Sequence, residues 1–72
     1  MRQPIPFNQS SQIKGLEYDA DEQTLYVQYK NGSVYTYHGV DADKANGFAS
    51  ADSAGKYLNA YVKGQHEYKQ IG

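Results

Sequence analysis

Apolar residues recur at every second position through the first half of the chain, a period that is typical of half-buried strands. The clearest example is residues 24–30, where Leu25, Val27 and Tyr29 fall on one face. A polar turn precedes this segment, and an Asn31-Gly32 turn follows it. We therefore expect an antiparallel meander of three strands, over residues 12–18, 24–30 and 33–38.

The period changes to that of a helix in the second half of the chain. Two helices are expected, over residues 42–49 after a cap at Asp41 and through Lys63 after a cap at Asp52 or Ser53. The inner faces are Ala45, Phe48 and Ala49 in the first helix, and Ala54, Tyr57, Leu58, Tyr61 and Val62 in the second. Gly47 weakens the first helix, whereas Gly64 is a natural stop for the second.

The two ends of the chain have weaker patterns. Residues 1–11 contain Pro4 and Pro6, which interrupt regular pairing, and are expected to form an irregular arm with Ile5 and Phe7 tucked against the domain. Residues 66–71 could add a short extra strand or lie extended. The expected fold is one α+β domain over residues 1–72, with both C-terminal helices packed on one face of the three-stranded sheet.

The Asn31-Gly32 turn leaves two registers open, and they place Tyr35 and Tyr37 on opposite faces. In a two-residue turn both rings face away from Leu25 and Val27. In a three-residue turn with Gly32 in the left-handed position, both rings join the apolar face. The three-residue register separates apolar from polar residues better and is favoured. It makes Tyr35 and Tyr37 walls of the core and leaves Tyr26 as the exposed ring.

Composition narrows the class of protein. The chain has 72 residues with no cysteine, so a disulfide framework and cysteine-ligated metals are excluded. Eight tyrosines supply large aromatic side chains that can be buried in a small core. Formation of a homodimer is another way in which a domain of this size could be stabilised. The net charge of −1 argues against strong non-specific binding to nucleic acid. We see no signal peptide or membrane segment, and the expected compartment is the cytoplasm.

An ordered set of segments resembles a known family, the KTSC domain. The set comprises Ser10-Ser11-Gln12-Ile13, Gly15 to Asp19, Leu25 to Tyr29, Asn31-Gly32, Val34 to Val40, Ser53 to Asn59, Val62-Lys63-Gly64 and Tyr68. The hallmark is the central Tyr-x-Tyr, here Tyr35-Thr36-Tyr37. The resemblance extends from about residue 9 to the end of the chain.

The resemblance implies an association with RNA. The family is named after a C-terminal extension of some lysyl-tRNA synthetases, and it also occurs as small free-standing bacterial and phage-related proteins. Family members tend to carry arginines where this chain has Lys56, Lys63 and Gln65. Lysine contacts phosphate as a point charge, but arginine also stacks and forms paired hydrogen bonds, so this chain departs from the pattern at the positions that matter for RNA.

The candidate binding residues are lysines for phosphates and rings for stacking. They are Lys30, Lys56, Lys63 and Lys69, with Tyr26, Tyr57, Tyr61 and His38. The competing interpretation is a scatter of solvated lysines with tyrosines at the rim of the core, because eight acidic residues are interleaved with the basic ones. Lys56 at a helix start could also hold one anion of a nucleotide-like ligand.

Catalytic and metal sites find little support in the sequence. No serine has a histidine or lysine context that resembles a catalytic triad. His38 and His66 are 28 positions apart without a known metal-binding spacing, so we expect neither metal nor cofactor. The sequence thus predicts a non-catalytic binding or accessory module, with RNA or tRNA as the leading ligand. The alternatives are a protein–protein adaptor or inhibitor, including a homodimer, and a binder of a small nucleotide-like ligand.

Overall fold

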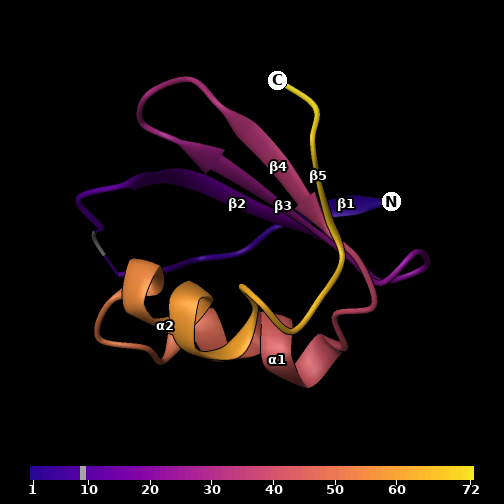
Figure 1. Cartoon of the computed structure of the whole chain (residues 1–72). Coiled ribbons are helices and arrows are strands. Elements are labelled where there is room, and N and C mark those ends of the chain that lie inside the picture. The colour runs from indigo at the N-terminus through magenta and orange to yellow at the C-terminus, as the bar shows by residue number, and fades with distance from the viewer. Residues whose placement is uncertain (9) are drawn as a thin grey trace.

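A five-stranded antiparallel sheet forms one layer of the molecule, and its strands follow one another in chain order (Figure 1). The computed structural model describes residues 1–8 and 10–72. The strands are β1 (Arg2–Pro4), β2 (Ile13–Asp19), β3 (Thr24–Tyr29), β4 (Val34–Tyr37) and β5 (Tyr68–Gln70). The helices are α1 (Ala42–Asn46), a 3₁₀ turn (Gly47–Ala49) and α2 (Ala54–Tyr61), and together they cover one face of the sheet.

The predicted meander is confirmed as the middle of this wider sheet. The prediction of an irregular arm was wrong for Arg2–Pro4, which pairs with residues 17–19 of β2. Pro4 is tolerated because β1 is an edge strand and needs no hydrogen bond from every residue. Residues 5–8 and 10–11 are irregular as expected, with Ile5 buried, whereas Gln9 lies outside the described residues. The short extra C-terminal strand exists as β5, on the free edge of β4.

The turn between β3 and β4 has the three-residue register. Leu25 pairs with Tyr37 and Val27 with Tyr35, and Gly32 takes a φ of 95°. The backbone N–H of Gly32 donates to the carbonyl of Tyr29 at 3.0 Å, which closes the turn. Both tyrosines of the Tyr-x-Tyr therefore face the helices, as the segregation of apolar residues predicted.

Both predicted helix caps are present. The side chain of Asp41 accepts a hydrogen bond from the Lys44 N–H at 2.8 Å, and Ser53 does the same for the Lys56 N–H at 3.4 Å. The first helix is shorter than expected, because its last turn tightens to a 3₁₀ turn. This change of period leaves Ala49 exposed, so its assignment to the inner face was wrong.

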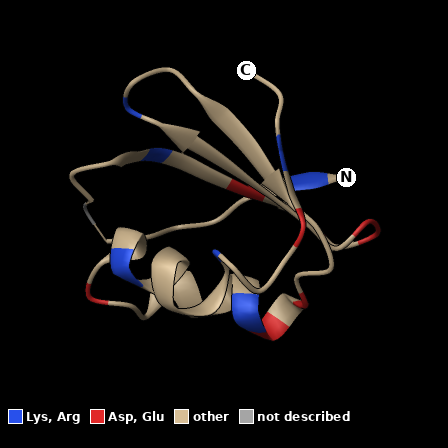
Figure 2. Ribbon diagram, viewed as in Figure 1, with Lys and Arg blue, Asp and Glu red and all other residues tan. Residues whose placement is uncertain are grey.

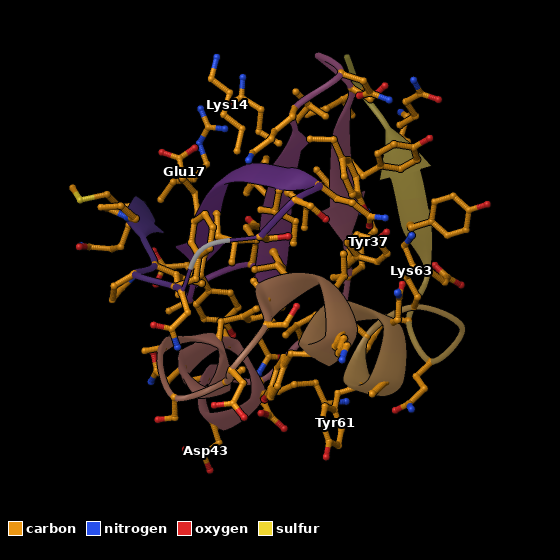
Figure 3. The ribbon with its side chains drawn as sticks, turned by 90° about the vertical axis from the view of Figure 1, so that its left-hand side faces the viewer. Lys14, Glu17, Tyr37, Asp43, Tyr61 and Lys63 are labelled. Carbon is orange, nitrogen blue, oxygen red and sulfur yellow. The ribbon has the colours of Figure 1, made fainter. Side chains whose placement is uncertain are left out.

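The core lies between the sheet and the helices. Its largest fully buried side chains are Phe48, Ile13, Leu25, Leu58, Val27, Val40 and Val62. Ile13 reaches this core because a β-bulge shifts the pairing by one residue between Ile13 and Gly15. Figure 3 shows Lys14 and Glu17 on the outer side of the sheet, away from the layer that contains Tyr37. Within residues 1–8 and 10–72, no helix has the length and apolar character needed to cross a bilayer.

Gly47 allows Tyr57 to lie against the end of α1. A Cβ on Gly47 would overlap the Tyr57 hydroxyl and approach its ring carbon Cζ to 2.6 Å. The ring cannot move aside freely, because its hydroxyl donates to the Lys44 carbonyl at 2.8 Å and its face packs on Phe48. The glycine that weakened the helix in the sequence thus has a packing role.

We expect Gly47→Ala to lower the free energy of unfolding by about 1–3 kcal/mol, because overpacking outweighs the helix propensity of alanine. Urea denaturation measures this change. In a Tyr57→Leu background the same substitution should cost much less. An equal cost in both backgrounds would show that the contact with Tyr57 is not the cause.

Candidate functional site

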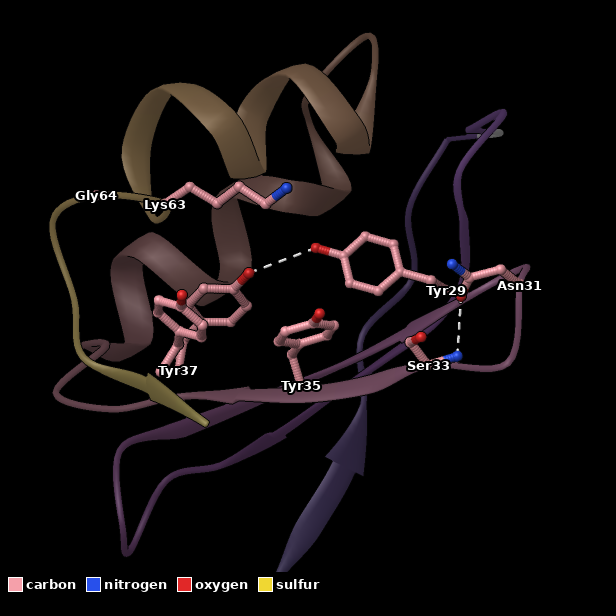
Figure 4. A pocket seen from close by; sticks show the side chains of 8 residues that line it. Tyr29, Asn31, Ser33, Tyr35, Tyr37, Lys63 and Gly64 are labelled. Atoms are coloured by element: carbon pink, nitrogen blue, oxygen red, sulfur yellow. Dashed lines mark hydrogen bonds between the residues drawn. The ribbon is translucent and has the colours of Figure 1, made fainter. Parts of the chain in front are cut away.

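Four tyrosine rings wall a groove at the end of the sheet nearest the β3–β4 turn (Figure 4). The groove has a volume of about 450 Å³, which is within the range of sites for small ligands. Its lining comprises Tyr29, Tyr35, Tyr37 and Tyr68, with Asn31, Ser33, Lys63 and Gly64. We call this feature the tyrosine groove.

The register of three strands brings the four rings together. Tyr29, Tyr35 and Tyr37 share the helix-facing side of β3 and β4 because the turn has three residues. Tyr68 of β5 lies directly opposite Tyr37 and adds the fourth ring. The helices bury Tyr37 but leave Tyr29 and Tyr35 half-buried, so the sheet surface stays open at this end.

The rings are close but not stacked face to face. Tyr29 and Tyr35 meet edge-on, with centroids 5.5 Å apart and planes at 90°. The Tyr68 ring lies 6.0 Å from the rings of both Tyr35 and Tyr37, tilted by 44° and 35°. Tyr68 is 65% exposed, which makes it the most accessible of the four tyrosines. Tilted and exposed ring faces are surfaces on which another planar group can stack.

The hydroxyls of the groove are hydrogen-bonded to one another and to β5. The oxygens of Tyr29 and Tyr37 lie 3.4 Å apart, and the Tyr35 hydroxyl donates to Oε1 of Gln70 at 3.3 Å. Burial, reinforced by the hydrogen bond to Tyr29, raises the pKa of Tyr37 well above its usual range. Tyr37 therefore remains a neutral wall of the groove at physiological pH.

Lys63 supplies the positive charge of the groove. It follows the end of α2, and its side chain extends toward Tyr29, with Nζ 5.6 Å from the ring centroid (Figure 4). None of the salt bridges in the described part of the chain involves Lys63. An ammonium group next to aromatic rings can attract a phosphate while the rings hold a base.

The structure does not unite the predicted binding residues on one surface. Figure 2 shows the basic residues spread over the sheet, a loop and both helices. Lys63 lines the tyrosine groove, and Lys30 lies beside it in the β3–β4 turn. Lys56 belongs to the first turn of α2 and is not part of the groove lining. Lys69 belongs to β5 and is exposed.

The rings that were predicted to stack on bases do not line the tyrosine groove. Tyr26 was expected to be exposed but is half-buried on the outer face, where the Arg2 guanidinium lies 4.5 Å from its ring centroid. Tyr57 packs on Phe48 with centroids 4.5 Å apart, so its ring is occupied by the core. Tyr61 is 52% exposed on α2, where it contacts Tyr57, so its assignment to the inner face of the helix was wrong. His38 is exposed, and its Nε2 lies 3.2 Å from the Thr36 hydroxyl.

The sequence did not identify Tyr29 and Tyr68 as site residues. Tyr29 carried a signal, since it shares a face with Tyr35 and Tyr37 in the favoured register. That signal predicted a core wall and not a groove. Tyr68 was noted only as part of the family resemblance, because the pairing of β5 with β4 is not visible in three exposed residues. Asn31 and Ser33 were recognised only as turn residues.

The two histidines are held by ordinary hydrogen bonds. His66 contacts the backbone carbonyl of His38 through Nδ1 at 3.0 Å and the Lys44 amine through Nε2 at 2.9 Å. Across residues 1–8 and 10–72, no group of three or more potential metal-ligating side chains comes together.

Buried tyrosine hydroxyls predict a loss of stability at high pH. Burial raises the pKa of Tyr18, Tyr37 and Tyr57 above the usual tyrosine value. The folded state holds these protons more tightly than the unfolded chain. Their contribution to stability is therefore complete below about pH 10 and is lost as the pH rises toward the raised values.

We expect the urea midpoint to fall as the pH rises above about 10, and to fall less steeply in Tyr37→Phe. Lysine deprotonation acts on both proteins alike, so the difference in slope isolates Tyr37. Equal slopes for both proteins would contradict the burial of its hydroxyl.

Together, the sheet, the two helices and the tyrosine groove define a small α+β domain with an aromatic surface groove. A sequence profile described as the KTSC domain matches residues 9–68. The chain belongs to the KTSC domain family, and the resemblance noted from its sequence is confirmed. It is similar to a crystal structure of a KTSC domain protein from Yersinia pestis, with a TM-score of 0.86 and 33% identity over the whole of both chains.

Two kinds of sequence relative accompany this structural match. An uncharacterized protein of Stutzerimonas stutzeri is 36% identical over 58 residues, which cover 81% of this chain and 82% of the relative. A lysine–tRNA ligase of a Nostoc species is 32% identical over 68 residues. That alignment covers 94% of this chain but only 12% of the ligase. The domain thus occurs in proteins of similar length and as a small part of far longer ones.

Proposed function

We propose that this protein is a non-catalytic RNA-binding module that holds an unpaired nucleotide in the tyrosine groove. The observation that carries the proposal is the combination of four tyrosine rings with the ammonium group of Lys63 in one open groove. The rings would stack on the base and Lys63 would contact the adjacent phosphate. No reaction is assigned to the groove.

The energetics favour a site dominated by stacking. Each base stacked on an aromatic side chain contributes roughly 1–3 kcal/mol, whereas a single exposed charge pair contributes about 0.2–1 kcal/mol. The net charge of −1 gives little general attraction to a polyanion. Binding should therefore depend on the groove and should favour single-stranded regions, because a base within a double helix is stacked on its neighbours and cannot expose its face.

The relatives support tRNA as the leading RNA. The chain aligns over nearly its full length with a segment of a lysine–tRNA ligase, a protein whose name includes tRNA. A domain attached to such a protein would be well placed to contact an unpaired region of its RNA. An RNA ligand also fits the expectation of a cytoplasmic protein.

The test is a titration of labelled mixed-sequence single-stranded RNA and of bulk tRNA, each at low and at moderate salt. Lys63→Glu and Lys56→Glu change the net charge equally, but only the first alters the groove. We expect binding that weakens with salt and a further loss of roughly fivefold in Lys63→Glu alone. Absence of binding at low salt, or equal losses in both variants, would contradict the proposal.

A protein partner is the second candidate, and the free edge of β5 favours it. All three residues of β5 are exposed, and the neighbouring Ile71 is 52% exposed. A free strand edge with apolar neighbours can pair with another chain, including a second copy of this one. Such docking would resist salt, and sedimentation would detect a homodimer.

A further inference from the structure

Asn31 presents a fixed hydrogen-bonding group at the rim of the tyrosine groove. Its side-chain oxygen accepts a hydrogen bond from the Ser33 N–H at 2.9 Å (Figure 4). This bond sets the orientation of the amide, since the amide nitrogen could not accept it. The NH₂ group is therefore the part left for a ligand, and no described residue accepts a hydrogen bond from it.

Two of the polar groups around the groove are fixed donors. The Lys63 ammonium can only donate, and the Asn31 NH₂ can only donate. The Ser33 and tyrosine hydroxyls can act either way. A base that enters the groove therefore meets fixed donors at two places, on the helix wall and on the turn.

These donors distinguish two kinds of nucleobase. Uracil and guanine carry a carbonyl oxygen on the edge away from the sugar, whereas cytosine and adenine carry an amino group there. With the phosphate at Lys63, on the helix wall, that edge would face the turn that carries Asn31 (Figure 4). A carbonyl would accept from the Asn31 NH₂, but an amino group would place donor against donor and gain no hydrogen bond there.

We propose that Asn31 makes the tyrosine groove selective for keto bases, uracil and guanine, over the amino bases cytosine and adenine. The proposal rests on the RNA-binding function proposed above and adds to it the class of base and the residue that selects it. One neutral hydrogen bond gained and one donor clash avoided correspond to a preference of roughly fivefold to tenfold.

The test compares oligouridine with oligocytidine, each about eight nucleotides long, by fluorescence anisotropy. The two pyrimidines have the same ring size, so stacking area differs little between them. We expect the wild type to bind oligouridine roughly fivefold to tenfold more tightly than oligocytidine. Equal affinities, or tighter binding of oligocytidine, would overturn the selectivity.

Asn31→Asp supplies the decisive variant. The aspartate can still accept from the Ser33 N–H, which keeps the turn, but its second oxygen replaces the donor with an acceptor. The added negative charge lowers the affinity for both oligonucleotides, so the readout is the ratio of the oligouridine affinity to the oligocytidine affinity. This ratio should fall to one or below. Asn59→Asp, an exposed position on α2, adds the same charge and should keep the wild-type ratio.

The outcomes separate the two proposals. If mixed-sequence RNA binds in the groove but the uridine-to-cytidine ratio is one, the base selectivity is wrong and the RNA-binding function stands. If the ratio favours uridine equally in wild type and Asn31→Asp, another group selects the base and the role of Asn31 is overturned. If no RNA binds at low salt, both proposals fail.

Discussion

Tyr68→Ala is expected to lower the affinity for single-stranded RNA by roughly fivefold to 150-fold, the range that corresponds to one stacked base. Tyr68 is the most accessible of the four tyrosines in the groove, and its ring lies 6.0 Å from both rings of the Tyr-x-Tyr. Because the side chain is 65% exposed, its removal should leave the free energy of unfolding almost unchanged. Fluorescence anisotropy with mixed-sequence RNA measures the loss.

Tyr61→Ala is the matched control for this prediction. Tyr61 is 52% exposed, but it lies on α2 outside the groove. In Figure 3 its side chain points away from the sheet. RNA affinity should change little in this variant. If both substitutions weaken binding equally, or if neither does, the RNA surface is not the tyrosine groove.

The second large effect concerns stability and is expected at Phe48. Its side chain is completely buried, and its ring packs on Tyr57 with centroids 4.5 Å apart. Phe48→Ala should lower the free energy of unfolding by about 3–5 kcal/mol, through lost burial and the cavity left behind. In a domain of this size that is much of the total stability, so the variant should be partly unfolded at room temperature.

Urea denaturation followed by circular dichroism measures this loss. Ala49→Ser, one position along the same 3₁₀ turn, is the control because Ala49 is exposed. Its effect should stay within about 0.5 kcal/mol. A loss below about 1 kcal/mol in Phe48→Ala would contradict the position of Phe48 at the centre of the core.

The middle of the fold could be predicted because its physical signals are local. The Asn31-Gly32 turn allowed two registers for β3 and β4, and the better separation of apolar from polar residues favoured the one that the structure has. Side-chain caps at Asp41 and Ser53 marked where the helices begin. Each of these signals lies within one hairpin or one helix start, so no knowledge of the tertiary structure was needed.

The sequence contained much weaker signals for the two outer strands, β1 and β5. Arg2–Pro4 and Tyr68–Gln70 have three residues each and are exposed throughout, so neither shows the alternation that marks a buried face. Their pairing is decided by the free edges of β2 and β4, which the sequence does not display. The proline in Arg2–Pro4 pointed away from a strand, although an edge strand accepts it.

The site was predictable only in part for a related reason. The register placed Tyr35 and Tyr37 on the helix-facing side, and Lys63 was among the expected phosphate contacts. Whether that side is covered depends on how far the helices reach across the sheet. Because α2 ends at Tyr61 and the chain turns back at Gly64, the rings near the β3–β4 turn stay open to solvent. The tertiary arrangement thus makes a groove out of residues that the pattern assigned to the core.

The most direct test of the central claim is an NMR titration of the protein with mixed-sequence single-stranded RNA, read from the backbone amide shifts. If the tyrosine groove binds RNA, the largest shifts should fall on Tyr29, Tyr35, Lys63 and Tyr68 and should weaken as salt rises. Shifts that centre on Lys56 at the start of α2, or on the outer face around Tyr26, would contradict the account. So would a spectrum that does not change at low salt.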